Sequence, residues 1–264
     1  MALFVSRVSP AVMLALAVGC HGGGPGRGDG AAADGAVDSG AADGDGGAAD
    51  LAGVGAAPDL SLADLGIAGD VVDKLLMLTA NCTTANMVSA HTYPDPGSLV
   101  NDVPICALNG AIFFDSDMDI DCDGRPTGNL CPGPDPSYQP DTAFHNLQDQ
   151  PLEAAVTPYV VIPADFAYPG LDTSNGGNVV AVIYNHQLAF AVFGDTGPTD
   201  LIGEASYACA ATLGIDPNPA TGGVRSGVTY VVFVGANTAP HDIESQAETR
   251  QLGEQLLTQL LANN

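Results

Sequence analysis

The sequence lacks tryptophan and is poor in basic residues. Its 264 residues include no Trp and only 6 Lys and Arg, against 31 Asp and Glu, so the formal net charge is −25 at pH 7. A field of this sign repels nucleic acid and anionic lipid and attracts metal ions or a polycationic substrate. It is also typical of an acidic exported protein that its charge keeps soluble. Composition therefore excludes nucleic acid as a partner and favours a cationic ligand.

The first 20 residues form a predicted export signal. Arg7 supplies a positive charge, and residues 11–18 are an apolar run too short to span a bilayer as a mature helix. The run ends in Ala-Val-Gly-Cys20, which is similar to a bacterial lipobox, although a leucine lies one position further out than usual. We predict a lipoprotein signal at residues 1–20, lipidation of Cys20, and anchoring at the bacterial cell surface or outer membrane. Ordinary secretion is the alternative.

Residues 21–70 are composed almost entirely of Gly, Ala and Asp. Such a segment has too little apolar surface to offset the entropy lost on ordering, so we expect a solvated tether, not a metal site. Residues 71–264 are predicted to form one catalytic domain that acts as a monomer. From residue 78 onward, 16 Asp and 5 Glu stand against 3 Arg, so the domain itself is strongly acidic.

Five cysteines follow Cys20, and an exported protein is expected to pair them as disulfides. Cys122 and Cys131 flank a loop rich in Gly and Pro and form the first predicted pair. Cys82 and Cys106 follow by elimination. Cys209 is then left as a buried thiol. No Cys-x-x-Cys pair occurs, so neither a zinc ribbon nor a redox motif is indicated.

Short apolar segments separated by turn-rich links predict a mainly β, barrel-like domain with peripheral helices. The segments read as strands are 111–114, 158–163, Val179–Tyr184, 188–193 and 228–234. The third and fourth form a predicted hairpin, buried on both faces because its apolar residues are nearly continuous. Helices are predicted over residues 70–79, from about Gly203, and over 241–261 with Asp242 as N-cap.

Two carboxylates, Asp195 and Glu204, lie nine positions apart after this hairpin. Asp195 is predicted at the end of a buried strand and Glu204 at the start of a helix. A general acid and a general base need such rigid supports, which fix their separation. Alternatively, Asp195 caps a turn and Glu204 stabilises the first turn of a helix.

A row of alternating acids precedes the Gly/Pro-rich loop. Asp117, Asp119, Asp121 and Asp123 are expected on one face of an extended segment, outside the core. The stretch from Asp119 to Gly124 matches the first half of a calcium loop, but the twelfth position is Leu130 instead of a bidentate Glu. An EF-hand is therefore not expected. The remaining interpretations are another calcium geometry, a carboxylate row that binds cationic groups of a substrate, and an exposed acidic edge strand.

Several blocks resemble the fungal-type chitosanases of glycoside hydrolase family 75: MDIDCDG, YVVIP, NVVAVIYN, GD followed by GEAS, and VTYVVF. They extend over roughly residues 110–234. The resemblance implies endo-acting, inverting hydrolysis of chitosan, with Asp195 and Glu204 as the catalytic pair and no cofactor or metal. Asp119, Asp121, Asp123 and Tyr207 are then candidates for substrate binding. Tyr207 stands where the fungal proteins tend to carry Trp, so Tyr138, Tyr168 and Tyr207 would have to stack on sugars.

The segment from Phe193 to Ile215 also resembles the strand–turn–helix of double-psi β-barrel proteins such as rare lipoprotein A. This resemblance implies a six-stranded, double-psi-like barrel. Because that group includes peptidoglycan lytic transglycosylases, a lipoprotein that cleaves the cell wall is one alternative function. A non-catalytic surface module that binds calcium or polycations is another.

Overall fold

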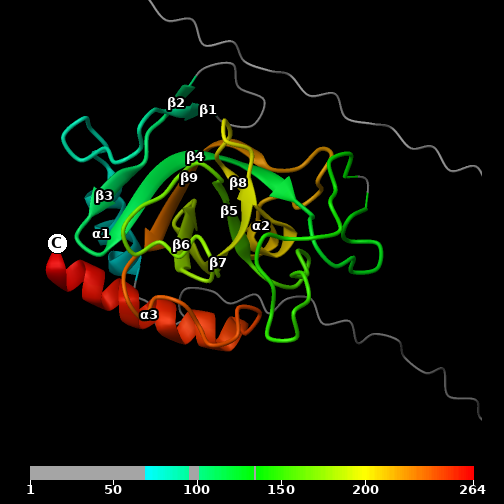
Figure 1. Ribbon diagram of the computed structural model, residues 1–264. Helices are drawn as coiled ribbons and strands as arrows, with labels where there is room; N and C mark the ends of the chain where they lie inside the picture. Colours follow the sequence, from blue (N-terminus) through cyan, green and yellow to red (C-terminus); the bar gives the residue numbers. More distant parts are fainter. Residues whose placement is uncertain (1–68, 95–100, 134) are drawn as a thin grey trace, which may run out of the picture. The chain divides into compact units, whose positions relative to one another are not determined.

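The structure, a computed structural model, describes residues 69–94, 101–133 and 135–264 (Figure 1). The predicted signal peptide with Cys20 and nearly all of the predicted tether lie outside the described residues. The helix predicted over residues 70–79 is α1 (Gly69–Thr79), which begins at Gly69, one residue earlier, within the predicted tether. In the described part of the chain, no helix is both long and apolar enough to cross a membrane.

Six strands close into a barrel in the order β4-β8-β5-β7-β6-β9, because β9 pairs back with β4 (Figure 1). Strand β3 extends the sheet beside β4, and β1 pairs with β2 separately. The strands are β1 Tyr93–Pro94, β2 Asn101–Val103, β3 Cys106–Leu108, β4 Ala111–Asp121, β5 Tyr159–Pro163, β6 Val179–Tyr184, β7 Gln187–Gly197, β8 Glu204–Ser206 and β9 Val224–Phe233. The pairs β4–β8 and β5–β7 are parallel. The predicted mainly β, six-stranded barrel is confirmed, and it is a mixed one.

The predicted hairpin is β6 and β7, joined by a two-residue turn. Asn185 and His186 both have positive φ (48° and 61°), the conformation that a tight hairpin turn needs. Alternate residues of β6 enter two different cores: Val180 and Val182 face the barrel interior, whereas Ala181 belongs to a second cluster outside the barrel. Both faces of this strand are therefore buried, which explains its continuous apolar sequence.

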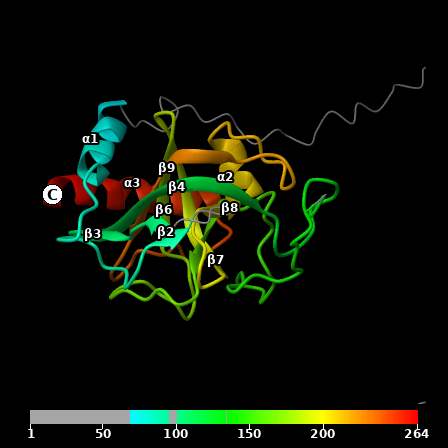
Figure 2. The same cartoon turned by 90° about the horizontal axis from the view of Figure 1, so that it is seen from above.

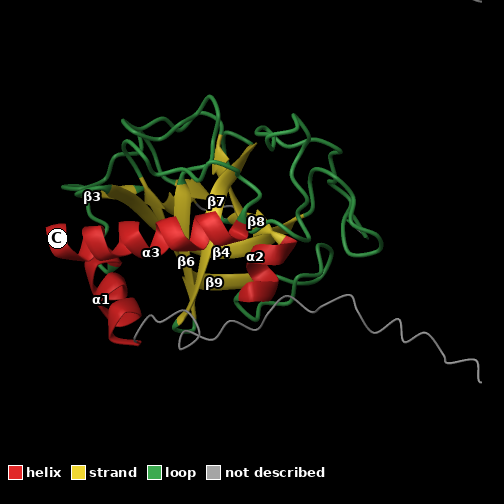
Figure 3. Ribbon diagram, turned by 90° about the horizontal axis from the view of Figure 1, so that it is seen from below, coloured by secondary structure: helices red, strands yellow, loops and turns green. Residues whose placement is uncertain are grey.

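The outer cluster is covered by helices α1 and α3. Helix α3 (Gln246–Asn263) packs along β6 and β7, as seen in Figures 1 and 3. At Gly253 the helix lies so close to the sheet that a Cβ atom would be 2.3 Å from the Phe190 ring. The helix begins later than predicted: Ser245, not Asp242, is its N-cap, and its hydroxyl accepts a hydrogen bond from the Glu248 amide.

The helix predicted from about Gly203 also begins later. Residues Glu204–Ser206 form strand β8, and α2 (Tyr207–Thr212) starts only after Ser206, whose hydroxyl accepts from the Cys209 amide. Glu204 therefore lies in the barrel wall and not in the first turn of a helix. Figure 2, a view from above, shows β8 next to β4 and leading into α2. Parallel pairing with β4 outweighs the local preference of these residues for a longer helix.

Both predicted disulfides are present, Cys82–Cys106 and Cys122–Cys131. Cys209 is a buried free thiol, as predicted, and burial raises its pKa to about 12. The second disulfide closes a loop that starts directly after β4. It thereby fixes the segment that carries Asp123 and the residues that follow it.

Candidate active site

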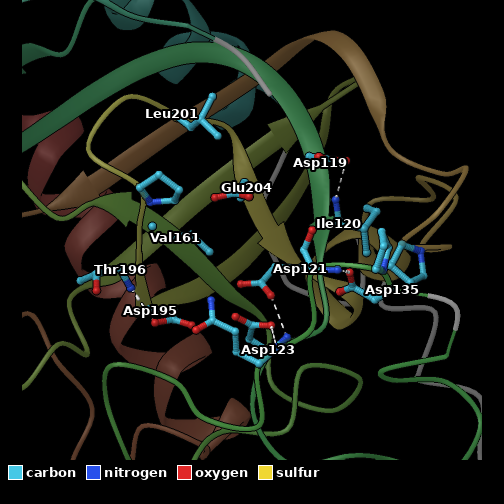
Figure 4. A pocket seen from close by; sticks show the side chains of 16 residues that line it. Asp119, Ile120, Asp121, Asp123, Asp135, Val161, Asp195, Thr196, Leu201 and Glu204 are labelled. Atoms are coloured by element: carbon cyan, nitrogen blue, oxygen red, sulfur yellow. Dashed lines mark hydrogen bonds between the residues drawn. The ribbon is translucent and has the colours of Figure 1, made fainter. Parts of the chain in front are cut away.

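The two predicted catalytic carboxylates line one pocket of about 460 Å³ (Figure 4). Asp195 comes from β7 and Glu204 from β8. Asp119 and Asp121 from β4, with Asp123 just beyond it, form the facing wall. Further lining residues from loops and neighbouring strands include Asp135, Ser137, Gln139, Val161, Thr196, Pro198, Leu201 and Pro219. The barrel thus brings together segments that lie up to 100 positions apart in the chain.

Asp195 is buried, and backbone amides hold it in place. Its Oδ1 atom accepts hydrogen bonds from the Ala143 and Thr196 amides, both at 2.7 Å. The preceding residue must be small, since a Cβ on Gly194 would lie 2.5 Å from the Tyr159 Cβ. Burial raises the pKa of Asp195 to about 6, although the two amide hydrogen bonds oppose the rise. Asp195 was predicted at the end of a strand, but it lies inside β7, which continues to Gly197.

Glu204 is the first residue of β8, in register with Asp119 of β4. It enters the strand from Gly203, whose φ of +103° favours glycine. None of the described residues donates a hydrogen bond to its carboxyl group. Burial, followed by the charge of Asp119, raises the pKa of Glu204 to about 7. The carboxyl group therefore holds its proton more readily than any ordinary glutamate.

The acidic row is organised differently from the prediction. Alternation holds, with Met118, Ile120 and Cys122 in the interior, but Asp117 is buried and accepts a hydrogen bond from the Ser116 hydroxyl at 3.1 Å. Gly203 covers it, as its Cβ would lie 2.2 Å from the Asp117 Oδ1. The expectation that all four acids lie outside the core was wrong for Asp117. Nor is β4 an edge strand, since it pairs with β3, β8 and β9.

Asp121, Asp123 and Asp195 form a cluster whose ligating oxygen atoms all lie within 4.8 Å of one another. Backbone amides anchor the other two as they anchor Asp195: the Asp123 amide donates to the Asp121 Oδ1, and the Gln139 amide donates to the Asp123 Oδ1. Burial and the neighbouring charges raise the pKa of Asp121 well above its usual range, and burial raises that of Asp123 to about 6. Three like charges this close favour a shared proton or a bound cation. Asp119 is not in the cluster, so the three acids of the calcium-loop-like stretch, Asp119, Asp121 and Asp123, do not converge on one point.

The predicted aromatic platform is not at this pocket. Tyr207 is partly buried against the barrel core, and neither Tyr138 nor Tyr168 lines the pocket among the described residues. The hydroxyl of Tyr138 instead donates to the Gly124 carbonyl at 2.9 Å. Three prolines, Pro136, Pro198 and Pro219, supply apolar pocket surface in place of aromatic rings.

One arginine, which the sequence pattern did not single out, connects the segment after the acidic row to residues 151–153 and to Glu244. Arg125 follows the acidic row and donates to both oxygens of Glu244 at 2.8 Å and to the Pro151 carbonyl at 2.6 Å; it also pairs with Glu153 at 3.0 Å. The scarcity of basic residues in this chain was the one available signal. A guanidinium group among so many acids is expected to form such charge-assisted hydrogen bonds.

The loop that holds Asp195 was also missed. His145 lies between Asp141 (2.8 Å) and Asp149 (3.0 Å), and hydrogen bonds to these two acids raise its pKa. The Thr142 hydroxyl donates to the Phe144 carbonyl, and together these contacts shape the turn that presents the Ala143 amide to Asp195. Nothing in the local sequence marks a backbone amide as part of a site.

Comparison with known proteins identifies the family. Residues 118–259, more than half of the chain, match the family described as fungal chitosanase of glycosyl hydrolase group 75. The chain belongs to this family. The match of the group 75 family reaches further than the blocks seen in the sequence, because it includes most of α3.

Curated relatives carry the same description. Endo-chitosanase C of Aspergillus oryzae is 33% identical over 168 residues, which cover 60% of this chain and 42% of the relative. An endo-chitosanase of Aspergillus fumigatus is 35% identical over 128 residues, covering 43% of this chain and 51% of the relative. Endo-chitosanase B of Aspergillus oryzae is 30% identical over 151 residues, covering 50% and 63%. The chain thus spans less than half the length of endo-chitosanase C.

Proposed function

We propose that this protein hydrolyses β-1,4 glycosidic linkages within chitosan chains, with Asp195 and Glu204 as its acid–base pair. The observation that carries the proposal is that both residues line one pocket together with Asp119, Asp121 and Asp123. A pocket this rich in carboxylates suits a sugar polymer whose amino groups are protonated. The family membership and the relatives named endo-chitosanase support the same substrate.

We assign the acid to Glu204 and the base to Asp195. A general acid must keep a proton until it reaches the leaving oxygen, and burial raises the pKa of Glu204 to about 7. A general base must be anionic, and the Ala143 and Thr196 amides favour the anionic form of Asp195. In an inverting mechanism the two carboxyl groups are separated by about 6.5–9.5 Å, which leaves room for the attacking water.

The facing acids would bind the ammonium groups of the substrate. Asp121 and Asp123 lie within 4.8 Å of Asp195, so an ammonium ion placed among them relieves their mutual repulsion. It would also lower the pKa of Asp195 and keep that residue anionic at the moment of attack. Chitin, whose amino groups are acetylated, offers no such charge.

Endo-action is supported by two further hollows that adjoin the pocket through different lining residues. One hollow of about 250 Å³ shares Asp123, Gln139, Asp195 and Thr196 with it. Another of about 520 Å³ shares Asp119. These hollows give a linear polymer room to extend beyond the pocket.

Residues 71–264 would form the catalytic unit and act as a monomer. The two disulfides support an exported protein. We retain the lipid anchor at Cys20 with residues 21–70 as a tether, and secretion without an anchor as the alternative. Mass spectrometry of the mature N-terminus distinguishes the two.

The decisive assay measures reducing ends released from chitosan, chitin and peptidoglycan. We expect activity on chitosan, reduced by about 10²–10⁴-fold in Asp195→Asn and in Glu204→Gln, because each change removes one proton-transfer group. Asp200→Asn is the matched control: Asp200 is exposed, lies between the two in sequence and does not line the pocket. Proton NMR of the first products checks inversion at the anomeric carbon.

Three outcomes would contradict the proposal. Equal chitosan hydrolysis by wild type and Glu204→Gln would remove Glu204 from the mechanism. Cleavage of peptidoglycan alone would indicate a cell-wall enzyme. Tight binding of chitosan or calcium without hydrolysis, unchanged in Glu204→Gln, would indicate a binding module.

A further inference from the structure

The hollow of about 520 Å³ beside Asp119 differs from the central pocket in its lining and in its charge. Strand β4 forms one side of it, through Asp117, Met118 and Asp119, and the segment from Thr221 to Arg225 forms the other. Gly223 brings this segment close to β4, and Gly222 lets the loop that precedes it fold back tightly on itself. A Cβ on Gly223, where φ is +79°, would lie 2.3 Å from the Met118 carbonyl oxygen, and one on Gly222 would lie 2.2 Å from the Asp216 carbonyl oxygen. Close packing of the backbone at these glycines therefore shapes the hollow, which adjoins the central pocket at Asp119.

The charge of this hollow is unlike that of the central pocket. Six carboxylates line the pocket: Asp119, Asp121, Asp123, Asp135, Asp195 and Glu204. The hollow shares only Asp119 with them, and its second acid, Asp117, is buried and hydrogen-bonded to Ser116. It also holds Arg225, which is exposed.

Arg225 is not held by an acid. Among the described residues no carboxylate forms an ion pair with its guanidinium, whereas Arg125 binds Glu153 and Glu244, and Lys74 binds Asp70. In a chain with a net charge of −25, an unpaired arginine at the groove is available for a ligand. A guanidinium group repels an ammonium ion and donates hydrogen bonds to a carbonyl oxygen.

We propose that the hollow at Arg225 binds an N-acetylated sugar unit in preference to a charged glucosamine unit. The guanidinium donates to the acetamide carbonyl, while the acids of the central pocket select protonated amino sugars. The pocket and the hollow together would recognise chains that contain both acetylated and deacetylated units. Cleavage would then occur at a fixed distance from an acetylated unit. This inference rests on the proposed hydrolysis of chitosan.

The experiment compares wild type, Arg225→Gln and Arg225→Glu on fully deacetylated and on partially acetylated chitosan. The readouts are the ratio of kcat/KM for the two substrates and the position of acetylated units relative to the new chain ends, from mass spectrometry. Arg250→Gln, a change on α3 away from the groove, is the control. We expect Arg225→Gln to shift the ratio about 2- to 5-fold toward the deacetylated polymer, and Arg225→Glu to shift it further.

The outcomes separate the two proposals. If all variants cleave chitosan with the same ratio and the same acetyl pattern, the role of Arg225 is wrong and the proposed function stands. If wild type cleaves neither polymer, the proposed function is wrong and the inference falls with it. A pattern that changes with Arg225 and not with Arg250 supports the inference.

Discussion

At the residue scale, the two central carboxyl groups differ in their hydrogen bonds. Asp195 receives two backbone amides, whereas the described residues donate none to Glu204. Ionised Glu204 therefore has only unfavourable surroundings, namely burial and the charges of Asp119, Asp123 and Asp195. The ionised form of such a group lowers the stability of the folded protein. The same surroundings raise its pKa, which suits a general acid.

Replacement of Glu204 by Gln should therefore stabilise the protein at high pH. The pKa of Glu204 is about 7 when folded against an ordinary 4.5, so the native state binds the proton more tightly and wild-type stability falls as the pH rises from 4.5 to 7. We expect a gain of about 2–3 kcal/mol above pH 7 and almost none at pH 4. Urea denaturation of both proteins across this range measures the difference.

The control for that measurement is Asp200→Asn, which removes an exposed negative charge from an already acidic molecule. A gain that is the same for both variants, or one that is independent of pH, would show that burial of Glu204 is not its cause.

At the scale of elements, the short strand β8 decides where Glu204 points. It is three residues long, and parallel pairing with β4 holds it. Gly203 allows the chain to enter β8 directly over Asp117. Local sequence suggests a helix here, because the segment contains good helix formers, but pairing with β4 outweighs that preference.

Gly203→Ala should disturb this entry more than an equivalent change elsewhere. The new Cβ would lie 2.2 Å from the Asp117 Oδ1 and 2.5 Å from the Ser116 Oγ. We expect a loss of about 2–4 kcal/mol and a loss of chitosan hydrolysis. Gly227→Ala is the matched control, because Gly227 also has a positive φ (+87°) but no atom within 4 Å of its added Cβ; it should cost about 1 kcal/mol. Equal losses in the two variants would mean that the contact with Asp117 is unimportant.

At the scale of the whole molecule, charge governs the encounter with substrate. The acids lie around a pocket in a barrel wall, and the chain carries a net charge of −25. A low-dielectric wall focuses such a field and attracts a polycation from a distance. The rigid barrel and the two disulfides hold these like charges together despite their repulsion.

The rate of chitosan hydrolysis at low substrate should therefore fall as salt is added. The Debye length shortens from about 30 Å at 0.01 M to about 8 Å at 0.15 M, so long-range attraction is screened. We expect kcat/KM to fall steeply over this range, while kcat at saturating chitosan changes little because the buried carboxyl groups are screened less. Steady-state kinetics at several NaCl concentrations test this; a kcat/KM that is independent of salt would exclude electrostatic steering.

The sequence alone determined much of the outcome. Continuous apolar runs predicted the hairpin and the mainly β barrel, because strands buried on both faces need such runs. Cysteine spacing predicted both disulfides, and the family-like sequence blocks predicted the family and placed the candidate pair Asp195 and Glu204, which line one pocket. These features are local, or they depend on residue type at fixed spacing.

Only the tertiary structure decided what surrounds that pair. Pairing of β8 with β4 placed Glu204 on a strand and not on a helix, and Gly203 buried Asp117. The Ala143 amide reached Asp195 from 52 positions away in the chain. Barrel closure brought Arg225 close to Asp119. Such contacts depend on backbone groups and long-range packing, for which a sequence pattern carries no local signal.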